Sequence, residues 1–388
     1  GEIIRNRCLE AGEDGATCEA RAAAARLNAA NSSVAAHLTV PGTKIEEWLD
    51  AGQCRDCFLP SFGYRPGGSA QYALALSNFD KDGAPTRFKW GFIASSDNHR
   101  ARAGTGYKPI DRLRQTDAVR VSRQWRPRIF PKGEPAAETY VIDPELLMNL
   151  GFAATEMERQ ASFWTTGGLA AVHAQGRSRD AIFDALERRE TYGTSGPRIL
   201  LWFNTVDGTP MGGTVSTDNS PVFEVKAVGA HKQKPGCPED TLDLLGAKRV
   251  QKLCANECYN PSDERLRITR IEIVRIRPQI TPDERVDGLI DDPWMVHKCP
   301  PDGEGCSFTF SDPAFAEGER MATYYARAIQ EPTERINADN LQCTYDAEGN
   351  CLKVNMCYGD DRTAASDECT RPVEERAWSS PIFVEYRN

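Results

Sequence analysis

Residues 167–203 read GGLAAVHAQGRSRDAIFDALERRETYGTSGPRILLWF, and this stretch decides the predicted fold class. Its beginning, residues 167–174, is a short apolar run that is typical of a buried strand. Ser178 is a good N-cap for an amphipathic helix over residues 179–190, and a second apolar strand follows over residues 199–203. Because strand and helix alternate, the sequence predicts an α/β layer or barrel.

The chain before this stretch contains another apolar run that ends in polar residues. Residues 88–99 read FKWGFIASSDNH, which predicts a strand over 88–94 that leads directly into Asp97 and His99. Helices are expected over residues 12–36 and 69–79, with a further one beginning at Thr43. Residues 100–160 are rich in Arg and Pro, and this composition indicates a long functional loop.

After about residue 204 the helical pattern largely disappears. Strands separated by turns are expected over residues 222–228, 266–276, 322–329 and 382–386. At roughly 150 residues per domain, 388 residues suggest at least two domains. We therefore expect an α/β domain over residues 1–203 and a cysteine-rich, β-sandwich-like domain over residues 204–388.

The composition excludes several classes of protein. The 47 basic and 56 acidic residues leave a net charge of −9, which argues against a nucleic-acid-binding protein. Hydrophobic residues make up 40% of the chain, enough for a large core. The longest apolar runs fall short of the ~20 residues that a membrane helix needs, so we expect no membrane span.

The 13 cysteines are an uneven number, and most lie in loop-like sequence beyond residue 237. Disulfides stabilise such loops in oxidising compartments, so we expect an exported protein, periplasmic or extracellular in a bacterium. A zinc site is the alternative interpretation, but the Cys254-x3-Cys258 pair lacks a second tight pair nearby. Cys54-x-x-Cys57 matches a redox motif without its usual βαβ context, which favours a structural disulfide over a thiol oxidoreductase. The disulfide candidates are Cys54, Cys57, Cys254, Cys258, Cys299, Cys306, Cys343, Cys351, Cys357 and Cys369.

Asp97 and His99 carry the clearest chemical signal. Active sites of α/β folds lie at the carboxyl ends of strands. Residues two apart in extended chain project to the same side, so both side chains can reach one metal ion. An Asp turn with a surface histidine is the alternative interpretation.

Residues 188–198 (RRETYGTSGPR) give a second signal, because hydroxyls beside arginines can hold a phosphate or another oxyanion. The alternative is a helix end with a glycine stop, followed by a turn over residues 191–197 into the next strand. His173 lies on a predicted strand, where a histidine is either a ligand or a hydrogen-bonded core residue.

Several of these motifs resemble a bacterial family of unknown function that is similar to the PHP (polymerase and histidinol phosphatase) metallohydrolases. The resemblance rests on residues 91–99, 103–108, 167–174, 179–183, 188–199 and 376–382. It implies a partial distorted β/α barrel, and the disulfide-rich, mostly β region that the strand pattern predicts would follow this barrel. It also implies that Asp97 and His99 bind divalent metal ions, namely Mn, Zn or Fe.

The resemblance further implies a hydrolase that acts on a small-molecule phosphoester. His173 and Arg198 are then the candidate catalytic residues, with His173 as a general acid or simply a packed residue. The candidate substrate-binding residues are Arg100, Arg102, Thr194 and Ser195.

PHP proteins begin with a His-x-His pair, which this sequence lacks. We therefore expect an N-terminal part of the same protein to precede this chain and to carry further ligands. A degenerate, non-catalytic exported binding or scaffold protein is the alternative hypothesis.

Overall fold

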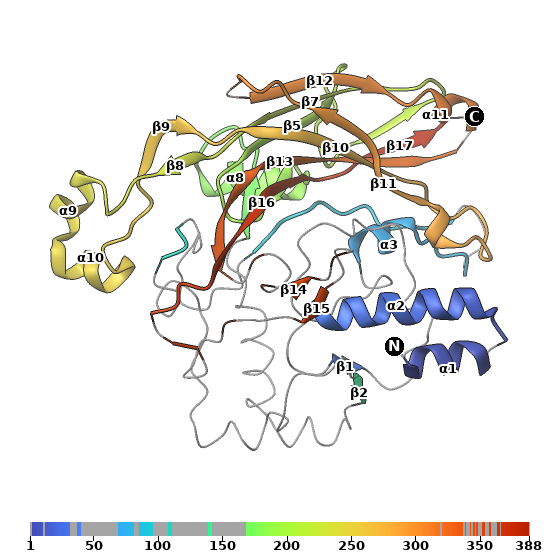
Figure 1. The fold of residues 1–388 in the computed structure, drawn as a ribbon. Coiled ribbons are helices and arrows are strands. Elements are labelled where there is room, and N and C mark those ends of the chain that lie inside the picture. Colours follow the sequence, from blue (N-terminus) through green and yellow to red (C-terminus); the bar gives the residue numbers. More distant parts are fainter. Residues whose placement is uncertain are drawn as a thin grey trace.

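The computed structural model describes most of the chain after residue 168 and selected segments before it. The described ranges are residues 2–10, 12–31, 37–39, 69–80, 85–95, 108–110, 139–141, 168–303, 305–318, 320–336 and 366–387, with short pieces between 338 and 364. Within these ranges the protein is a mixed α/β structure that consists mostly of sheet (Figure 1).

A large sheet of eight strands forms the centre of the described structure. Its strands run in the order β11 (Ile290–Lys298), β10 (Ile268–Ile276), β13 (Ala322–Ile336), β16 (Thr370–Ser379), β4 (Thr191–Thr194) and β3 (Leu169–Val172), with β17 (Ile382–Tyr386) pairing with β13 and β6 (Thr214–Thr217). Only the β17–β6 pair of this sheet is parallel among the described strands. Long antiparallel strands of this kind bring distant segments of sequence together, so the sheet joins residues 169–194 to the last strands of the chain.

A smaller sheet packs on one face of the large sheet. It consists of β12 (Gly305–Ser311), β7 (Val222–Val228) and β5 (Leu200–Thr205). Strand β7 alternates exposed and buried residues, so Phe223 points into the core. The Phe223 ring lies 5.0 Å from that of Phe310 and 4.9 Å from that of Tyr324 in the large sheet. These aromatic contacts join the two sheets into a sandwich-like core.

Described segments from before residue 100 cover the opposite face of the large sheet. Helix α3 (Ala70–Ala75) and the segment 85–95 lie along this face (Figure 1). Leu74 is buried against the sheet, and the Phe92 ring meets that of Tyr325 edge-on at 5.3 Å. Strand β13 is therefore covered on both sides, which explains why nine consecutive residues from Ala322 are buried.

The remaining elements lie around these layers. They are α1 (Glu2–Glu10), α2 (Gly15–Asn31), β1 (His37–Thr39), β2 (Thr139–Val141), α8 (Arg179–Glu187), β8 (His231–Gln233), α9 (Glu239–Leu245), α10 (Ala247–Cys254), β9 (Pro261–Arg265), the 3-10 turn η3 (Val286–Gly288), α11 (Pro313–Gly318), β14 (Thr344–Tyr345) and β15 (Cys351–Lys353). Helices α9 and α10 project from the sheets on the strands β8 and β9 (Figure 1). No helix among the described residues is long and apolar enough to cross a membrane.

Several predicted elements are correct. Strands β7 and β17 have the predicted bounds, β10 and β13 overlap the predicted strands, and α8 begins after Ser178 as expected. The Ser178 side chain accepts a hydrogen bond from the Ala181 backbone, which is the predicted N-cap. The helix expected from Thr43 lies outside the described residues.

Other predictions are wrong. The apolar run at residues 88–94 is not a strand, because its backbone is held by side chains rather than by a neighbouring ladder. The stretch expected to be a turn over residues 191–197 begins with strand β4, which pairs with β16 from the end of the chain. Three short helices, α9, α10 and α11, occur after residue 204, where strands alone were predicted by position and the helical pattern largely disappears. Strands β3 and β4, which precede residue 203, share the large sheet with strands that follow it, and β5 of the smaller sheet spans residue 203.

The described part of the chain contains four disulfides. They join Cys8 to Cys18, Cys237 to Cys258, Cys299 to Cys306, and Cys357 to Cys369. The predicted disulfide cysteines Cys258, Cys299, Cys306, Cys357 and Cys369 are confirmed. Cys258 is bonded to Cys237 rather than to its nearer neighbour in sequence, Cys254. Cys54, Cys57, Cys343 and the Cys351 side chain lie outside the described residues.

A buried ion network lies at the middle of the large sheet. Arg327 of β13 donates to Glu272 of β10 at 2.7 Å and, through a second nitrogen, to Asp292 of β11 at 2.5 Å. The Arg327 and Asp292 side chains are only 2% and 1% exposed. Gln71 of α3 donates to Asp292 at 2.7 Å, so the network also holds the N-terminal layer against the sheet.

We predict that Arg327→Ala lowers the free energy of unfolding by about 3–5 kcal/mol, because it removes the guanidinium that pairs with the buried Glu272 and Asp292 carboxylates. Arg188→Ala is the matched control, since the Arg188 side chain is 47% exposed and its solvent-screened ion pair with Glu190 should contribute little to stability. Urea titration of both variants measures the difference. Similar midpoints for the two variants would contradict the central role of the network.

Candidate functional site

The segment 85–95, which leads to the predicted metal motif, is held along strand β4. The Phe92 backbone N–H donates to Ser380 Oγ at 2.8 Å, and the Phe92 carbonyl accepts from Thr191 Oγ1 at 2.9 Å. The two hydroxyl oxygens are themselves 2.9 Å apart. Thr191 and Ser380 are both buried, so these bonds replace a strand ladder and fix the position of the segment.

Two glycines allow this segment to come very close to the sheet. A Cβ atom on Gly193 would lie 2.7 Å from the Ala94 Cβ atom, and one on Gly168 would lie 2.1 Å from the Ser95 carbonyl oxygen. Gly168 also has a φ of +84°, which side chains other than glycine rarely adopt. Any larger residue at either position would have to displace the segment.

The contacts show the direction in which the segment runs. Phe92 lies beside Thr191, Ala94 beside Gly193, and Ser95 beside Gly168. Because Leu169, which follows Gly168, pairs with Thr194, Ser95 lies level with the C-terminal end of β4. The segment therefore runs parallel to β4 and ends where β4 ends.

The predicted metal ligands Asp97 and His99 follow Ser95 in the sequence but lie outside the described residues. The same holds for the predicted substrate-binding residues Arg100 and Arg102. The described residues thus define the segment that precedes the motif and not the motif itself.

The predicted substrate-binding residues Thr194 and Ser195 are at the end of β4 and are engaged within the protein. Thr194 is 2% exposed, and its hydroxyl accepts from the Gly196 backbone at 3.2 Å. Ser195 Oγ donates to Glu375 at 2.5 Å and accepts from the Arg376 backbone at 2.8 Å. Both hydroxyls fix the turn that leads to Arg198.

A pocket of about 220 Å³ opens beyond this turn. The predicted catalytic residue Arg198 lines it, with its guanidinium 3.7 Å from the centre of the Tyr259 ring. This cation–π contact orients the guanidinium while leaving the side chain exposed. Lys232 is a second exposed cation at the pocket, and it forms an exposed ion pair with Glu264.

A buried ion pair forms the inner wall of the pocket. Glu375 accepts from Arg335 at 2.9 Å, from Ser195 at 2.5 Å and from Thr333 at 3.2 Å. Burial raises the pKa of the Glu375 carboxyl, although Arg335 and the two hydroxyls favour its charged form. A buried carboxyl with a raised pKa in a pocket wall is a candidate proton carrier as well as a structural residue.

His173 lies apart from this ion pair, at the end of β3. Its Nε2 atom is 2.9 Å from the Leu201 carbonyl oxygen, and its ring packs near those of Tyr192 and Trp202. Because a carbonyl only accepts, Nε2 carries the proton and donates it to Leu201. This contact matches the packed, hydrogen-bonded interpretation of His173 more closely than that of a general acid.

Potential metal ligands gather at two places within the described ranges. Both groups contain a disulfide: Cys237, Cys254 and Cys258 form one, and Cys357, Asp367 and Cys369 form the other. None of the described histidines belongs to such a group. The Asp and His ligands that the resemblance implies would therefore come from residues beyond the described ranges, which include Asp97 and His99.

Most residues of the pocket carry no signal in the sequence. Tyr259, Arg335 and Glu375 belong to three segments that are far apart in the chain and that carry no local motif. Glu375 directly precedes the motif at residues 376–382, which is the only sequence signal near it. The pairing of β16 with β4 and with β13 brings Glu375 and Arg335 to Arg198, and Tyr259 reaches Arg198 from the segment between α10 and β9.

Comparison with known families gives a match over part of the chain. A family model described as a protein of unknown function (DUF3604) matches residues 76–206. The chain is similar to DUF3604 over this stretch. The match to DUF3604 includes the segment along β4, the predicted ligands Asp97 and His99, and Arg198. No curated protein and no solved structure matches the chain.

We predict that Gly168→Ala displaces the segment 85–95 and destabilises the protein more than Gly208→Ala does. Both glycines have a positive φ, but a Cβ atom on Gly208 would meet nothing within 4 Å. The backbone conformation costs each variant about 1–2 kcal/mol, and the overlap with Ser95 should add about 1–3 kcal/mol to Gly168→Ala. Urea titration compares the two, and equal losses would show that the close approach to Ser95 is not required.

Proposed function

We propose that the protein is a metal-dependent hydrolase of small-molecule phosphoesters, with Asp97 and His99 as metal ligands. The main support is the path of the segment 85–95, which is held along β4 and ends level with the turn that leads to Arg198. The motif that resembles a metal site thus follows a rigidly held segment next to an anion-binding candidate. Active sites of α/β proteins commonly form where such segments leave a sheet.

The side chains suit the proposed chemistry. Carboxylate and imidazole groups bind Mn, Zn and Fe, and such ions lower the pKa of a bound water and polarise phosphoryl oxygens. Arg198 would bind the phosphoryl oxygens, because a planar guanidinium donates two parallel hydrogen bonds to such a group. The Ser195–Glu375 contact would hold the turn that carries Arg198. His173 would support the β3–β5 packing through Leu201 rather than transfer a proton.

We also propose that residues 1–203 belong to a PHP-like barrel, as the family resemblance implies. The proposal also includes a periplasmic or extracellular location in a bacterium. The four disulfides of the described residues support this location, because such bonds persist in oxidising compartments.

We predict that the full-length protein binds a divalent metal ion and that Asp97→Ala and His99→Ala each abolish this binding. Elemental analysis of the purified protein, after dialysis against Mn, Zn or Fe, measures the metal content. Asp184→Ala is the matched control, because Asp184 is an exposed carboxylate on α8 and should leave the metal content unchanged. Metal content that is unchanged in both site variants would refute the proposed ligands.

We predict that Arg198→Ala lowers kcat/KM for p-nitrophenyl phosphate, or for another phosphoester that the metal-loaded protein hydrolyses, by about 10- to 100-fold. This range corresponds to the loss of a charged hydrogen bond of about 1.5–3 kcal/mol. Metal content should stay at the level of the unchanged protein, since Arg198 is not a proposed ligand. Arg179→Ala is the control, because Arg179 is exposed at the start of α8.

A non-catalytic binding protein is the second candidate function, and the pocket at Arg198 and Tyr259 is the observation that favours it. Such a protein would bind anions through Arg198 without metal-dependent turnover. Binding of inorganic phosphate that Arg198→Ala abolishes, together with no hydrolysis in the presence of Mn, Zn or Fe, would support this function over the hydrolase.

A further inference from the structure

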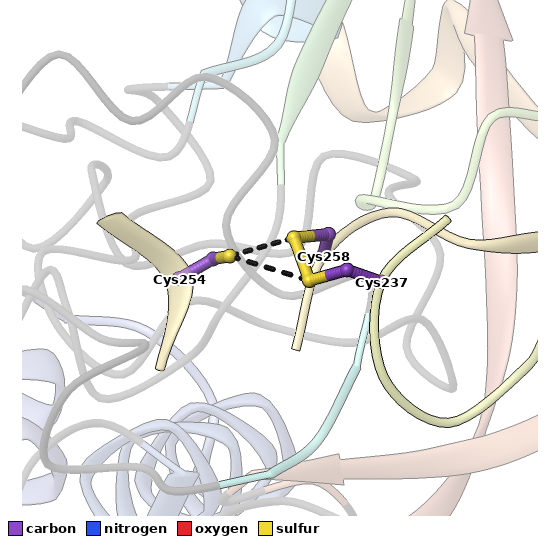
Figure 2. Close-up of side chains that lie close together, drawn as sticks. All are labelled: Cys237, Cys254 and Cys258. Atoms are coloured by element: carbon purple, nitrogen blue, oxygen red, sulfur yellow. Dashed lines mark hydrogen bonds between the residues drawn. A yellow bond between two sulfur atoms is a disulfide. The ribbon is translucent and has the colours of Figure 1, made fainter. Parts of the chain in front are cut away.

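Three cysteine sulfurs meet at the base of the unit formed by α9 and α10. This unit connects strands β8 and β9 and projects from the sheets (Figure 1). Cys237 lies just before α9, Cys254 is the last residue of α10, and Cys258 follows four residues later. Figure 2 shows the three side chains directed toward one another.

The three sulfurs form a compact triangle around one disulfide. Cys237 and Cys258 are bonded, and the Cys254 sulfur lies 2.7 Å from that of Cys258 and 3.7 Å from that of Cys237 (Figure 2). The Cys254 thiol donates to the Val250 carbonyl at 3.4 Å, as expected for a cysteine in the last turn of a helix. All three residues are partly exposed, so thiol reagents can reach them.

The backbone at the base of the unit is held together by contacts other than the disulfide. Lys108 donates both to the Gly236 carbonyl and to the Glu257 carboxylate, each at 2.7 Å. The Gly236 N–H donates to the same carboxylate at 2.9 Å, and the Cys258 N–H donates to the Gly236 carbonyl at 3.2 Å. Breaking the Cys237–Cys258 bond would therefore leave the two cysteines next to each other.

The ion pair between Lys108 and Glu257 also stabilises the backbone at the foot of the α9–α10 unit near neutral pH. Burial raises the pKa of Glu257, but the hydrogen bonds from Lys108 and Gly236 and the positive charge of Lys108 outweigh it, so the pKa is lowered overall. The Glu257 carboxylate therefore accepts hydrogen bonds from Lys108 and Gly236 in its charged form.

We propose that Cys237, Cys254 and Cys258 form a thiol–disulfide exchange centre. In this step the Cys254 thiolate attacks the Cys258 sulfur, a Cys254–Cys258 bond forms, and the Cys237–Cys258 bond breaks. The electron pair of the broken bond leaves on Cys237 as a thiolate, which takes up the proton that Cys254 released. The step is an isomerisation that needs no oxidant or reductant.

The geometry explains how the exchange occurs. Attack on a disulfide proceeds along the line of the S–S bond, whereas the three sulfurs form a triangle. Rotation of the Cys254 side chain about its Cα–Cβ bond is therefore needed to bring the sulfurs into line. The helix end at Cys254 permits this rotation, since Ala255 and Asn256 already leave the helix in left-handed conformations.

The exchange moves the covalent link from one loop to another. The Cys237–Cys258 bond spans 21 residues and closes the whole α9–α10 unit, whereas a Cys254–Cys258 bond closes only the turn after α10. Tyr259, which carries the cation–π contact to Arg198, directly follows Cys258. Cys258, whose disulfide partner changes in the exchange, therefore lies one residue before Tyr259 in the pocket wall.

Three neighbouring sulfurs also match the ligand type of a zinc or copper ion. Exchange is the better supported interpretation, because two of the three sulfurs are bonded to each other and the nearby Glu257 is engaged with Lys108. Metal binding is an outcome that the experiment below distinguishes.

The proposal is tested by determining which of the three cysteines carries the thiol when the full-length protein is kept without reductant. Thiols are blocked with N-ethylmaleimide after acid quenching, and the blocked protein is then reduced, alkylated with iodoacetamide and digested with trypsin. Cleavage after Lys252 places Cys237 and Cys254 on different peptides. Mass spectrometry should find the maleimide label on both peptides, because both isomers are populated. Label on Cys254 alone would overturn the proposal.

Two variants give independent evidence. In Cys254→Ser the label on Cys237 should be lost, and in Cys237→Ser neither Cys254 nor Cys258 should carry the label, because these two residues pair. Cys299→Ser is the matched control, since Cys306 should then carry the label with no change at the centre. Far-UV circular dichroism verifies that each variant folds.

A label on Cys258 in Cys237→Ser would show that Cys254 does not take over the bond, and would overturn the proposal. So would stoichiometric zinc or copper in the protein that is lost in Cys254→Ser. These outcomes are independent of the proposed hydrolase, whose test measures metal held by Asp97 and His99.

Discussion

The buried guanidinium of Arg327 is the constraint on which the described structure depends. It lies in the longest strand of the large sheet, and its two carboxylate partners come from the next two strands. A charge removed from water needs its counter-charges close by, so this network aligns β13, β10 and β11. Gln71 extends the network to α3, and the N-terminal layer is thereby attached to the same strands that carry the aromatic core on their other face.

The close approach of residues 91–95 to β4 has a similar importance for the candidate site. Backbone approaches backbone there because Gly168 and Gly193 have no side chain, and the Thr191 and Ser380 hydroxyls satisfy the Phe92 backbone. The pocket at Arg198 is built on the continuation of the same strand, with Ser195 bonded to Glu375. The functional proposal therefore depends on strand β4, which holds residues 91–95 along its length and leads into the turn that carries Arg198.

Much of the fold could be predicted wherever a local pattern coincides with burial. Residues 222–228 alternate between the core and solvent, and Ser178 caps its helix through a local hydrogen bond, so both predictions are correct. The apolar run at residues 88–94 does not form the predicted strand, because apolar residues indicate burial and not the partner that satisfies the backbone. Strand β4 was missed because its residues, TYGT, resemble a turn until the distant strand β16 pairs with them. Cys299 and Cys306 were found as close neighbours in sequence, whereas the partner of Cys258 lies 21 residues away.

The sequence by itself determined that the protein is rich in disulfides, mixed α/β and well provided with core residues, and it located the motifs that are similar to a family of unknown function. These properties follow from composition and from interactions between residues close in the chain. Only the tertiary structure decided that Glu375 lines the pocket of Arg198, that three cysteines meet below α9 and α10, and that Arg327 shares its charge with two neighbouring strands. Such contacts join residues that are far apart in the chain, and antiparallel pairing over long sequence separations, which no local pattern encodes, brings them together.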